Sequence, residues 1–158
     1  MESNYPVFIE ISQGTKNNKY ERDPKTGELV LDFVFKNLIW PFNYGEIPNT
    51  LGGDGDRLDA IVFSSVPLAQ GETVLCTPFG VMRSLDRGEV DDKLLMVPTG
   101  DLLFQKYHDI GDFTESERQK LRELYAEIAK QKRKTIVITD FQDKQAAIVL
   151  IESAFIKE

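Results

Sequence analysis

Three carboxylates lie within six residues in the segment GGDGDRLDA, at Asp54, Asp56 and Asp59. Hard cations such as Mg²⁺ prefer carboxylate oxygens, and Mg²⁺ is usually held by a few carboxylates together with water and substrate phosphates. A calcium-binding EF-hand does not fit, because a loop counted from Asp54 has Asp59 where glycine is required and Ser65 where glutamate is required. Two interpretations remain open for the segment alone, a magnesium site and a solvated acidic turn.

Two further groups of charged residues lie on either side of this segment, and each contains carboxylates and a lysine. They are Glu10, Lys19 and Glu21 upstream, and Asp86, Asp91 and Lys93 downstream. If a sheet brings the three regions together, their like charges cost several kcal/mol unless cations neutralise them. The sequence contains neither GxxxxGK[ST] nor GxGxxG, the loops that cradle phosphates. Phosphate chemistry at such a site would therefore depend on metal ions and side chains.

The elements that must position these residues are mainly β-strands. Between residues 7 and 98, short runs rich in Val, Ile, Leu and Phe alternate with Gly, Pro, Asn and Asp, which is typical of strands joined by tight turns. Residues 23–28, DPKTGE, are expected to form a hairpin loop. Because the strands follow each other without intervening helices, a barrel or a tight antiparallel sheet is favoured over a doubly wound α/β sheet.

The last third of the chain changes to a helical period. Thr114 and Glu117 have capping-box spacing, and the apolar residues that follow recur at i, i+3, i+4 and i+7. The recurring residues are Leu121, Leu124, Tyr125 and Ile128. Residues 134–141 are predicted to form a short strand, and residues 143–158 a second helix that closes the chain.

The composition predicts a single domain over residues 1–158. The chain is 41% hydrophobic, which is enough to build one core at this length. A net charge of −7 argues against nucleic acid as a partner. Cys76 and His108 are the only residues of their types, so a cysteine-rich zinc site and thiol catalysis are disfavoured. A cytoplasmic location without a membrane partner is expected, since no apolar run is long enough to span a bilayer and no signal peptide is recognisable.

Three segments, in their order and spacing, resemble one known family. NKYERDPKTGELVLD, WPFNYGEIPNTLGGDGDRLDAIV and GVMRSLDRGEVDDKLLMVP are similar to the family I soluble inorganic pyrophosphatases, and DGDRLDA is similar to the signature of that family. The resemblance implies an α+β fold, mainly β, with a small OB-like closed β-barrel flanked by two helices. It also implies Mg²⁺-dependent hydrolysis of inorganic pyrophosphate to two orthophosphates by a metal-activated water. Several Mg²⁺ ions, Mn²⁺ as an alternative metal, and a homo-oligomer (trimer or hexamer) belong to the same expectation.

The resemblance further implies a role for each matching position. The metal carboxylates would be Asp54, Asp59, Asp86 and Asp91, and further acids linked to metal or water would be Glu10 and Glu21. The groups that contact phosphate oxygens would be Lys19, Tyr44, Lys93 and Tyr125. Asp56 would be the catalytic residue that takes a proton from the attacking water or orients it, and Tyr44 would act beside it.

Four positions depart from the family pattern. Phe33 stands where an arginine is usual and Ala126 where a lysine is usual, so two phosphate-binding cations are missing. Arg57 replaces a proline, and Glu46 stands where an aromatic residue is common. We hypothesise that Lys36 or Arg57 supplies the missing charge. Two alternative functions therefore stay open: hydrolysis of another phosphoanhydride or phosphoester on the same scaffold, and a weak or inactive homologue that binds metal and phosphate.

Overall fold

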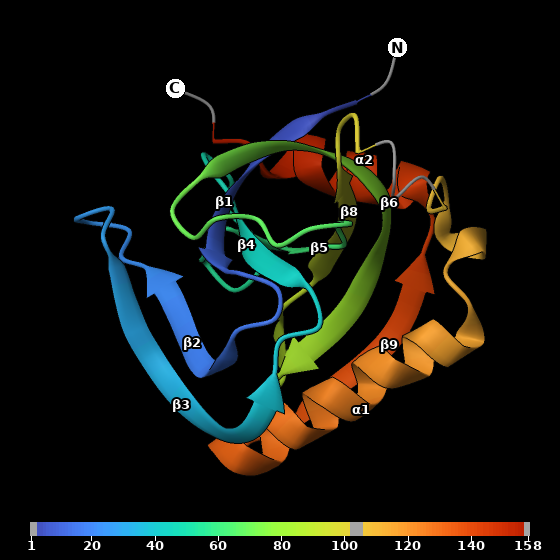
Figure 1. Ribbon diagram of the computed structural model, residues 1–158. Coiled ribbons are helices and arrows are strands. Elements are labelled where there is room, and N and C mark those ends of the chain that lie inside the picture. Colours follow the sequence, from blue (N-terminus) through green and yellow to red (C-terminus); the bar gives the residue numbers. More distant parts are fainter. Residues whose placement is uncertain (1–2, 102–105, 157–158) are drawn as a thin grey trace.

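The computed structural model describes residues 3–101 and 106–156, which form a mainly β protein with two α-helices (Figure 1). The strands are β1 (Tyr5–Ile11), β2 (Lys16–Arg22), β3 (Leu29–Ile39), β4 (Asn43–Ile47), β5 (Leu58–Val62), β6 (Thr73–Asp86), β7 (Glu89–Val90), β8 (Lys93–Pro98) and β9 (Ile136–Gln142). The helical elements are the 3₁₀-helix η1 (Ile110–Asp112) and the α-helices α1 (Glu115–Lys132) and α2 (Lys144–Ala154).

Five of the strands close into a hydrogen-bonded ring. β1 pairs with β4, β4 with β5, β5 with β8, β8 with β6, and β6 returns to β1. These pairings are antiparallel except that of β5 with β8, which is parallel. β7 and β9 extend the sheet from β6. The expectation of a mainly β, OB-like fold with two flanking helices is therefore confirmed.

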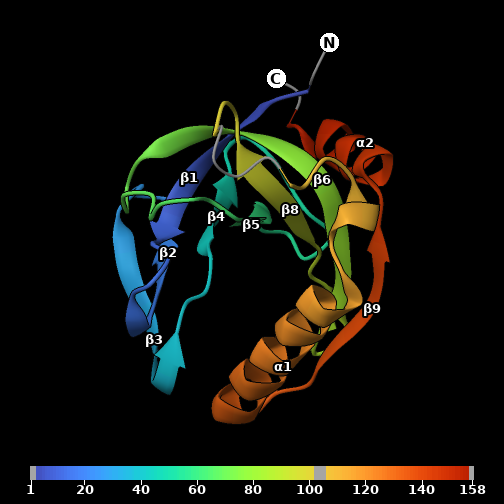
Figure 2. The same ribbon diagram turned by 45° about the vertical axis from the view of Figure 1, so that its right-hand side comes forward.

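β2 and β3 form a separate antiparallel ribbon beside the ring. Figure 2 shows this ribbon on one side of the molecule and α1 with β9 on the other. The strands are joined by the predicted hairpin loop, residues 23–28, in which the Asp23 carboxylate accepts from the Lys25 N–H at 2.7 Å. The Trp40 indole N–H donates to the Asn18 carbonyl at 3.0 Å, which ties the ribbon to the core.

α1 forms where the capping box and the apolar period predict it. The Thr114 hydroxyl accepts from the Glu117 N–H at 3.2 Å, and the Glu117 carboxylate accepts from the Thr114 N–H at 3.1 Å. Leu121, Tyr125 and Ile128 are buried, so the predicted apolar face packs on the core.

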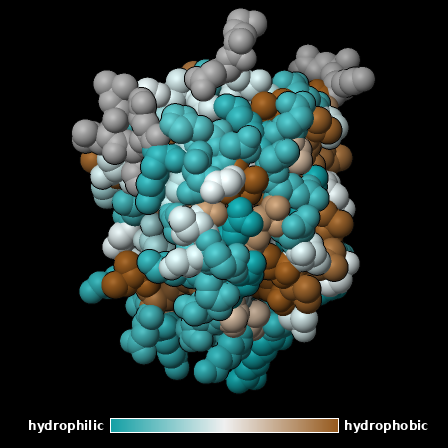
Figure 3. All heavy atoms as spheres, turned by 90° about the vertical axis from the view of Figure 1, so that its right-hand side faces the viewer, coloured by the Kyte–Doolittle hydropathy of each residue, from teal (hydrophilic) through white to brown (hydrophobic). Residues whose placement is uncertain are grey.

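Figure 3 shows the side of the molecule that lies to the right in Figure 1 largely covered by hydrophilic side chains. None of the helices in the described part of the chain is both long and apolar enough to cross a membrane.

α2 is shorter than predicted. It follows the cap residue Asp143, whose carboxylate accepts from the Ala146 N–H at 2.9 Å, and it ends at Ala154. Phe155 has an extended backbone and pairs with Thr50 in an isolated bridge, so this tertiary pairing competes with continuation of the helix. The last two residues of the predicted helix lie outside the described residues.

Two clusters of buried side chains hold the ring and the helices together. The aromatic cluster, which includes the buried face of α1, contains Phe35, Trp40, Phe42, Phe79 and Phe113 among others. The mainly aliphatic cluster, which includes the buried face of α2, contains Val7, Ile9, Cys76, Leu94 and Ile151 among others. Full burial of one large apolar side chain stabilises a fold by about 1.5–3 kcal/mol, so these clusters are the principal source of its stability.

Replacing Gly45 with alanine is expected to lower the free energy of unfolding by about 3 kcal/mol or more. Gly45 lies in β4, where a Cβ would stand 2.0 Å from the Phe8 carbonyl oxygen of the paired strand β1. Neither backbone can move away without breaking the ring. Urea denaturation measures the difference. Gly111→Ala is the control, because a Cβ there meets no atom within 4 Å, and equal losses for the two variants would contradict the prediction.

Candidate active site

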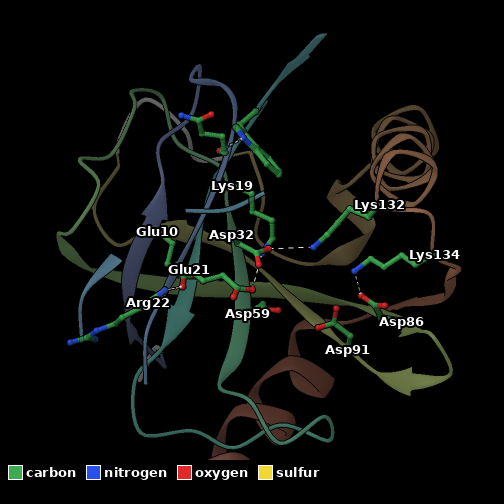
Figure 4. A network of polar contacts seen from close by, with 12 residues as sticks. Glu10, Lys19, Glu21, Arg22, Asp32, Asp59, Asp86, Asp91, Lys132 and Lys134 are labelled. Carbon is green, nitrogen blue, oxygen red and sulfur yellow. Dashed lines mark hydrogen bonds and ion pairs between the residues drawn. The ribbon is translucent and has the colours of Figure 1, made fainter. Parts of the chain in front are cut away.

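A pocket of about 570 Å³ is lined by strands of the ring, by β2, by the loop between β4 and β5, and by α1. All of the predicted site residues are among those that line it, namely Glu10, Lys19, Glu21, Tyr44, Asp54, Asp56, Asp59, Asp86, Asp91, Lys93 and Tyr125. Figure 4 shows how several of these side chains approach one another. The fold therefore brings together three segments that are far apart in the sequence. The individual roles of the residues stay predictions.

Lys93 joins two of the predicted metal carboxylates. The parallel pairing of β5 with β8 places Asp59 opposite Lys93, and the Lys93 Nζ lies 3.0 Å from the Asp59 carboxylate and 2.9 Å from that of Asp91. Burial opposes the charge of Lys93, but the two carboxylates outweigh burial and raise its pKa. The rings of Tyr44 and Tyr125 lie 5.6 and 5.9 Å from the same ammonium group. Both predicted tyrosines thus flank one cation.

The loop after β4 presents the other two aspartates of the GGDGDRLDA segment. Gly55 has a φ of 86°, which glycine adopts without strain, and the Asp54 carboxylate accepts from the Asp56 N–H at 3.0 Å. The Gly52 N–H donates to the Asp56 carbonyl at 2.7 Å and closes the turn. Burial and the charges of Asp54 and Asp59 raise the pKa of Asp56. The Asp56 carboxylate therefore has a higher affinity for a proton than an isolated aspartate has.

Glu10 is a buried carboxylate whose charge is only partly compensated. It accepts a hydrogen bond from the Arg22 N–H at 2.6 Å. Burial outweighs this bond and, with the charges of Asp59 and Glu46, raises the pKa of Glu10 to about 8. Burial also raises the pKa of Asp91. This part of the pocket holds more negative charge than its protein partners neutralise, which favours the binding of cations.

Lysines from the ribbon and from α1 meet at Asp32 (Figure 4). The Lys19 Nζ lies 2.9 Å from the Glu21 carboxylate and 3.1 Å from an Asp32 oxygen. The Lys132 Nζ lies 3.3 Å from that same Asp32 oxygen. Two ammonium groups are thus part of the lining of the acidic pocket.

Lys134, directly beyond the cap of α1, lies 2.6 Å from the Asp86 carboxylate (Figure 4). The sequence predictions missed Lys132 and Lys134, which line the pocket, and Asp32, which pairs with Lys132. The one sequence signal for the two lysines is the basic run KQKRK at residues 130–134. Such a run is also what a helix C-terminus commonly carries, because cations there complement the helix dipole.

The missing cations of the family pattern are not replaced from β3. Phe33 packs against Phe35 with ring centroids 4.6 Å apart, and Ala126 lies on the exposed side of α1, outside the pocket. Lys36 is exposed and does not line the pocket. Its backbone N–H and carbonyl bond to the Gln131 side chain at 2.8 and 2.9 Å. The hypothesis that Lys36 supplies the missing charge is therefore wrong.

Arg57 and Glu46 lie beside each other in the pocket wall. The Arg57 Nε lies 3.9 Å from the Glu46 carboxylate, and both atoms are buried without a hydrogen-bond partner among the described residues. Burial raises the pKa of Glu46, whereas the charges of Arg57 and Arg22 oppose that rise. The positive charge of Arg57 thus partly offsets the negative charge of Glu46, which is itself a departure from the family pattern. Its contribution to phosphate binding stays a prediction.

The donor set of the pocket fits hard cations, because its acidic wall offers many carboxylate oxygens and no sulfur ligand. As they stand, no three acidic, histidine or cysteine side chains within residues 3–101 and 106–156 are arranged to hold a metal ion. Instead, an ammonium group lies between Asp59 and Asp91. A bound cation would need these carboxylates to turn away from Lys93 or to share their oxygens with it.

The fold and the pocket define a class: a small, mainly β protein whose acidic pocket, flanked by lysines, suits cation-assisted chemistry on phosphates. The family model described as inorganic pyrophosphatase matches residues 7–157, and the chain belongs to that family.

Relatives and solved structures agree with this assignment. The chain is 31% identical to soluble inorganic pyrophosphatase 1 of Arabidopsis thaliana, over 94% of its own length and 70% of that protein. It is 33% identical to the inorganic pyrophosphatase of Synechocystis sp., over 92% of its own length and 86% of the relative. The crystal structure of the Thermus thermophilus inorganic pyrophosphatase matches with a TM-score of 0.87 at 32% identity and covers 96% of this chain and 88% of that one.

Proposed function

We propose that the protein hydrolyses inorganic pyrophosphate to two orthophosphates with the help of Mg²⁺, for which Mn²⁺ can substitute. The observation that carries the proposal is the common pocket: every site residue of this chain that matches the family pattern lines it. Lysines from different elements stand among these acids, so a diphosphate in the pocket would meet ammonium groups as well as metal ions.

The acidic wall is the proposed metal-binding side. Asp54, Asp59, Asp86 and Asp91 would hold the ions, and Glu10 and Glu21 would bind water or metal beside them. When bound, the magnesium ions supply positive charge to the phosphate oxygens and make water more acidic. Asp56 takes up the proton that the attacking water loses. Its raised pKa favours this step, because a base is most effective when its pKa approaches the working pH.

The lysines and tyrosines form the proposed phosphate-binding side. Lys93 carries a buried positive charge that its acidic neighbours maintain, so it is available to a phosphate oxygen throughout the neutral pH range. Lys19 offers a second ammonium group from the ribbon. Burial raises the pKa of Tyr44 and of Tyr125, so both hydroxyls stay protonated and act as hydrogen-bond donors.

The proposal extends to the wider organisation of the protein. The length and the apolar content support one domain over residues 1–158. A homo-oligomer, trimer or hexamer, and a cytoplasmic location stay predictions of the sequence resemblance and of the composition.

Phosphate release from a panel of substrates tests the proposal. With Mg²⁺ present, inorganic pyrophosphate is expected to release phosphate at a higher kcat/KM than tripolyphosphate or any nucleoside di- or triphosphate. A higher value for tripolyphosphate or for a nucleotide would instead support hydrolysis of another phosphoanhydride. Binding of Mg²⁺ without phosphate release from any substrate would instead support the alternative that the protein is an inactive homologue that binds metal.

A further inference from the structure

The C-terminal end of α1 is held against the β2–β3 ribbon. The Gln131 side-chain amide bonds to the backbone N–H and carbonyl of Lys36 in β3, at 2.8 and 2.9 Å. The helix then ends at the cap residue Arg133, which has a left-handed backbone with φ of 54°. Because of this cap, Arg133 is exposed while Lys132 and Lys134 both line the pocket.

Lys132 enters the pocket over the ring of Phe33. Its Nζ lies 5.4 Å from the Phe33 ring centroid and 3.3 Å from the Asp32 carboxylate, and its side chain is only 16% exposed. Phe33 is the position at which the family pattern has an arginine. The Lys132 ammonium group therefore lies beside Phe33, where an arginine of the family pattern would place its guanidinium group.

Lys132 and Lys19 share a single carboxylate oxygen, so an additional anion could bind both ammonium groups. One Asp32 oxygen is shared between Lys132 at 3.3 Å and Lys19 at 3.1 Å. Burial and the repulsion from the charges of Lys19 and Lys134 lower the pKa of Lys132, and the Asp32 carboxylate opposes this effect. A phosphate group between Lys19 and Lys132 would relieve that repulsion, and its several acceptor oxygens can bind more than one ammonium group.

We propose that Lys132 binds a phosphate group of the substrate on the α1 side of the pocket, where it takes the place of the arginine that Phe33 replaces. Asp32 holds the ammonium group in the free protein and shares it with phosphate in the complex. This inference rests on the proposed function, since it assigns a binding residue to the same pocket. Lys132 would otherwise be a structural residue that only fastens α1 to the ribbon.

Binding of a non-hydrolysed analogue tests the assignment. Lys132→Met keeps an aliphatic stem over Phe33 and removes the charge. Titration calorimetry with methylenediphosphonate at a fixed Mg²⁺ concentration is expected to show about 10- to 100-fold weaker binding, the loss of one charge-assisted hydrogen bond. Lys132→Arg is expected to bind within about threefold of wild type, because a guanidinium group also binds phosphate. Kinetically, Lys132→Met is expected to raise KM more than it lowers kcat.

Lys130→Met is the matched control, because Lys130 is an exposed lysine in the same helical turn and lies outside the pocket. Its affinity for the analogue is expected to equal that of wild type. Unchanged affinity in Lys132→Met, or an equal loss in both methionine variants, would overturn the assignment. If the wild type binds the analogue without hydrolysing pyrophosphate, the proposed function fails, and the comparison of the two variants still decides the role of Lys132.

Discussion

Asp56→Asn is expected to lower kcat for pyrophosphate hydrolysis by about 10²- to 10⁴-fold, the usual contribution of a positioned acid or base. The amide has nearly the same shape as the carboxylate but cannot accept the proton that the attacking water loses. The turn itself is held by backbone groups, since the Asp56 N–H donates to Asp54 and the Asp56 carbonyl accepts from Gly52. The fold should therefore be unaffected.

Steady-state phosphate release at saturating Mg²⁺ measures this effect, and thermal denaturation checks the fold. Glu72→Gln is a suitable control, because Glu72 is an exposed acid outside the pocket and its loss removes the same charge. If Asp56→Asn turns over pyrophosphate as fast as Glu72→Gln does, Asp56 is not the base.

Lys93→Met is expected to destabilise the metal-free protein by about 2–3 kcal/mol and to make its stability strongly dependent on Mg²⁺. Removal of the ammonium group leaves the Asp59 and Asp91 carboxylates, which lie 3.0 and 2.9 Å from it, facing each other without a cation. The expected loss is below that of a fully buried pair, because both carboxylates keep some contact with solvent. A divalent cation bound by the two acids would restore the missing charge.

Urea denaturation with and without Mg²⁺ measures both parts of this prediction. Mg²⁺ at about 100 times its dissociation constant contributes roughly 2.7 kcal/mol, and this gain is expected to be larger in Lys93→Met than in wild type. Lys130→Met serves again as the control for the loss of one positive charge. A Lys93→Met protein that is as stable as wild type without metal would contradict the predicted repulsion between Asp59 and Asp91. One that gains nothing from Mg²⁺ would contradict their assignment as metal ligands.

The elements that sequence patterns predicted correctly are those set by local interactions. The Thr114–Glu117 capping box starts α1, and the hairpin loop at residues 23–28 joins β2 to β3. The end of α2 was predicted too late, because the pairing of Phe155 with Thr50 depends on a contact across the fold. A pattern within one segment contains no information about such a contact.

The departures from the family pattern were visible in the sequence, but what compensates them was not. Lys36 is the lysine nearest to Phe33 along the chain, yet it does not line the pocket. Lys132 is about a hundred residues further along the chain and reaches the Phe33 ring because Gln131 fastens the end of α1 to β3. Proximity along the chain was therefore misleading at this site.

The sequence by itself determined the chemical identity of the site: the carboxylates of GGDGDRLDA and LDRGEVDD, the lysines and tyrosines that accompany them, and the strand and helix periods that carry them. Only the tertiary structure decided which charges face each other. It placed Lys93 between Asp59 and Asp91, Arg57 beside Glu46, Lys132 beside Asp32 and Lys134 beside Asp86. The reason is physical, because the free energy of a charge depends on its distance from other charges and on its burial, and both are set by the packing of remote elements.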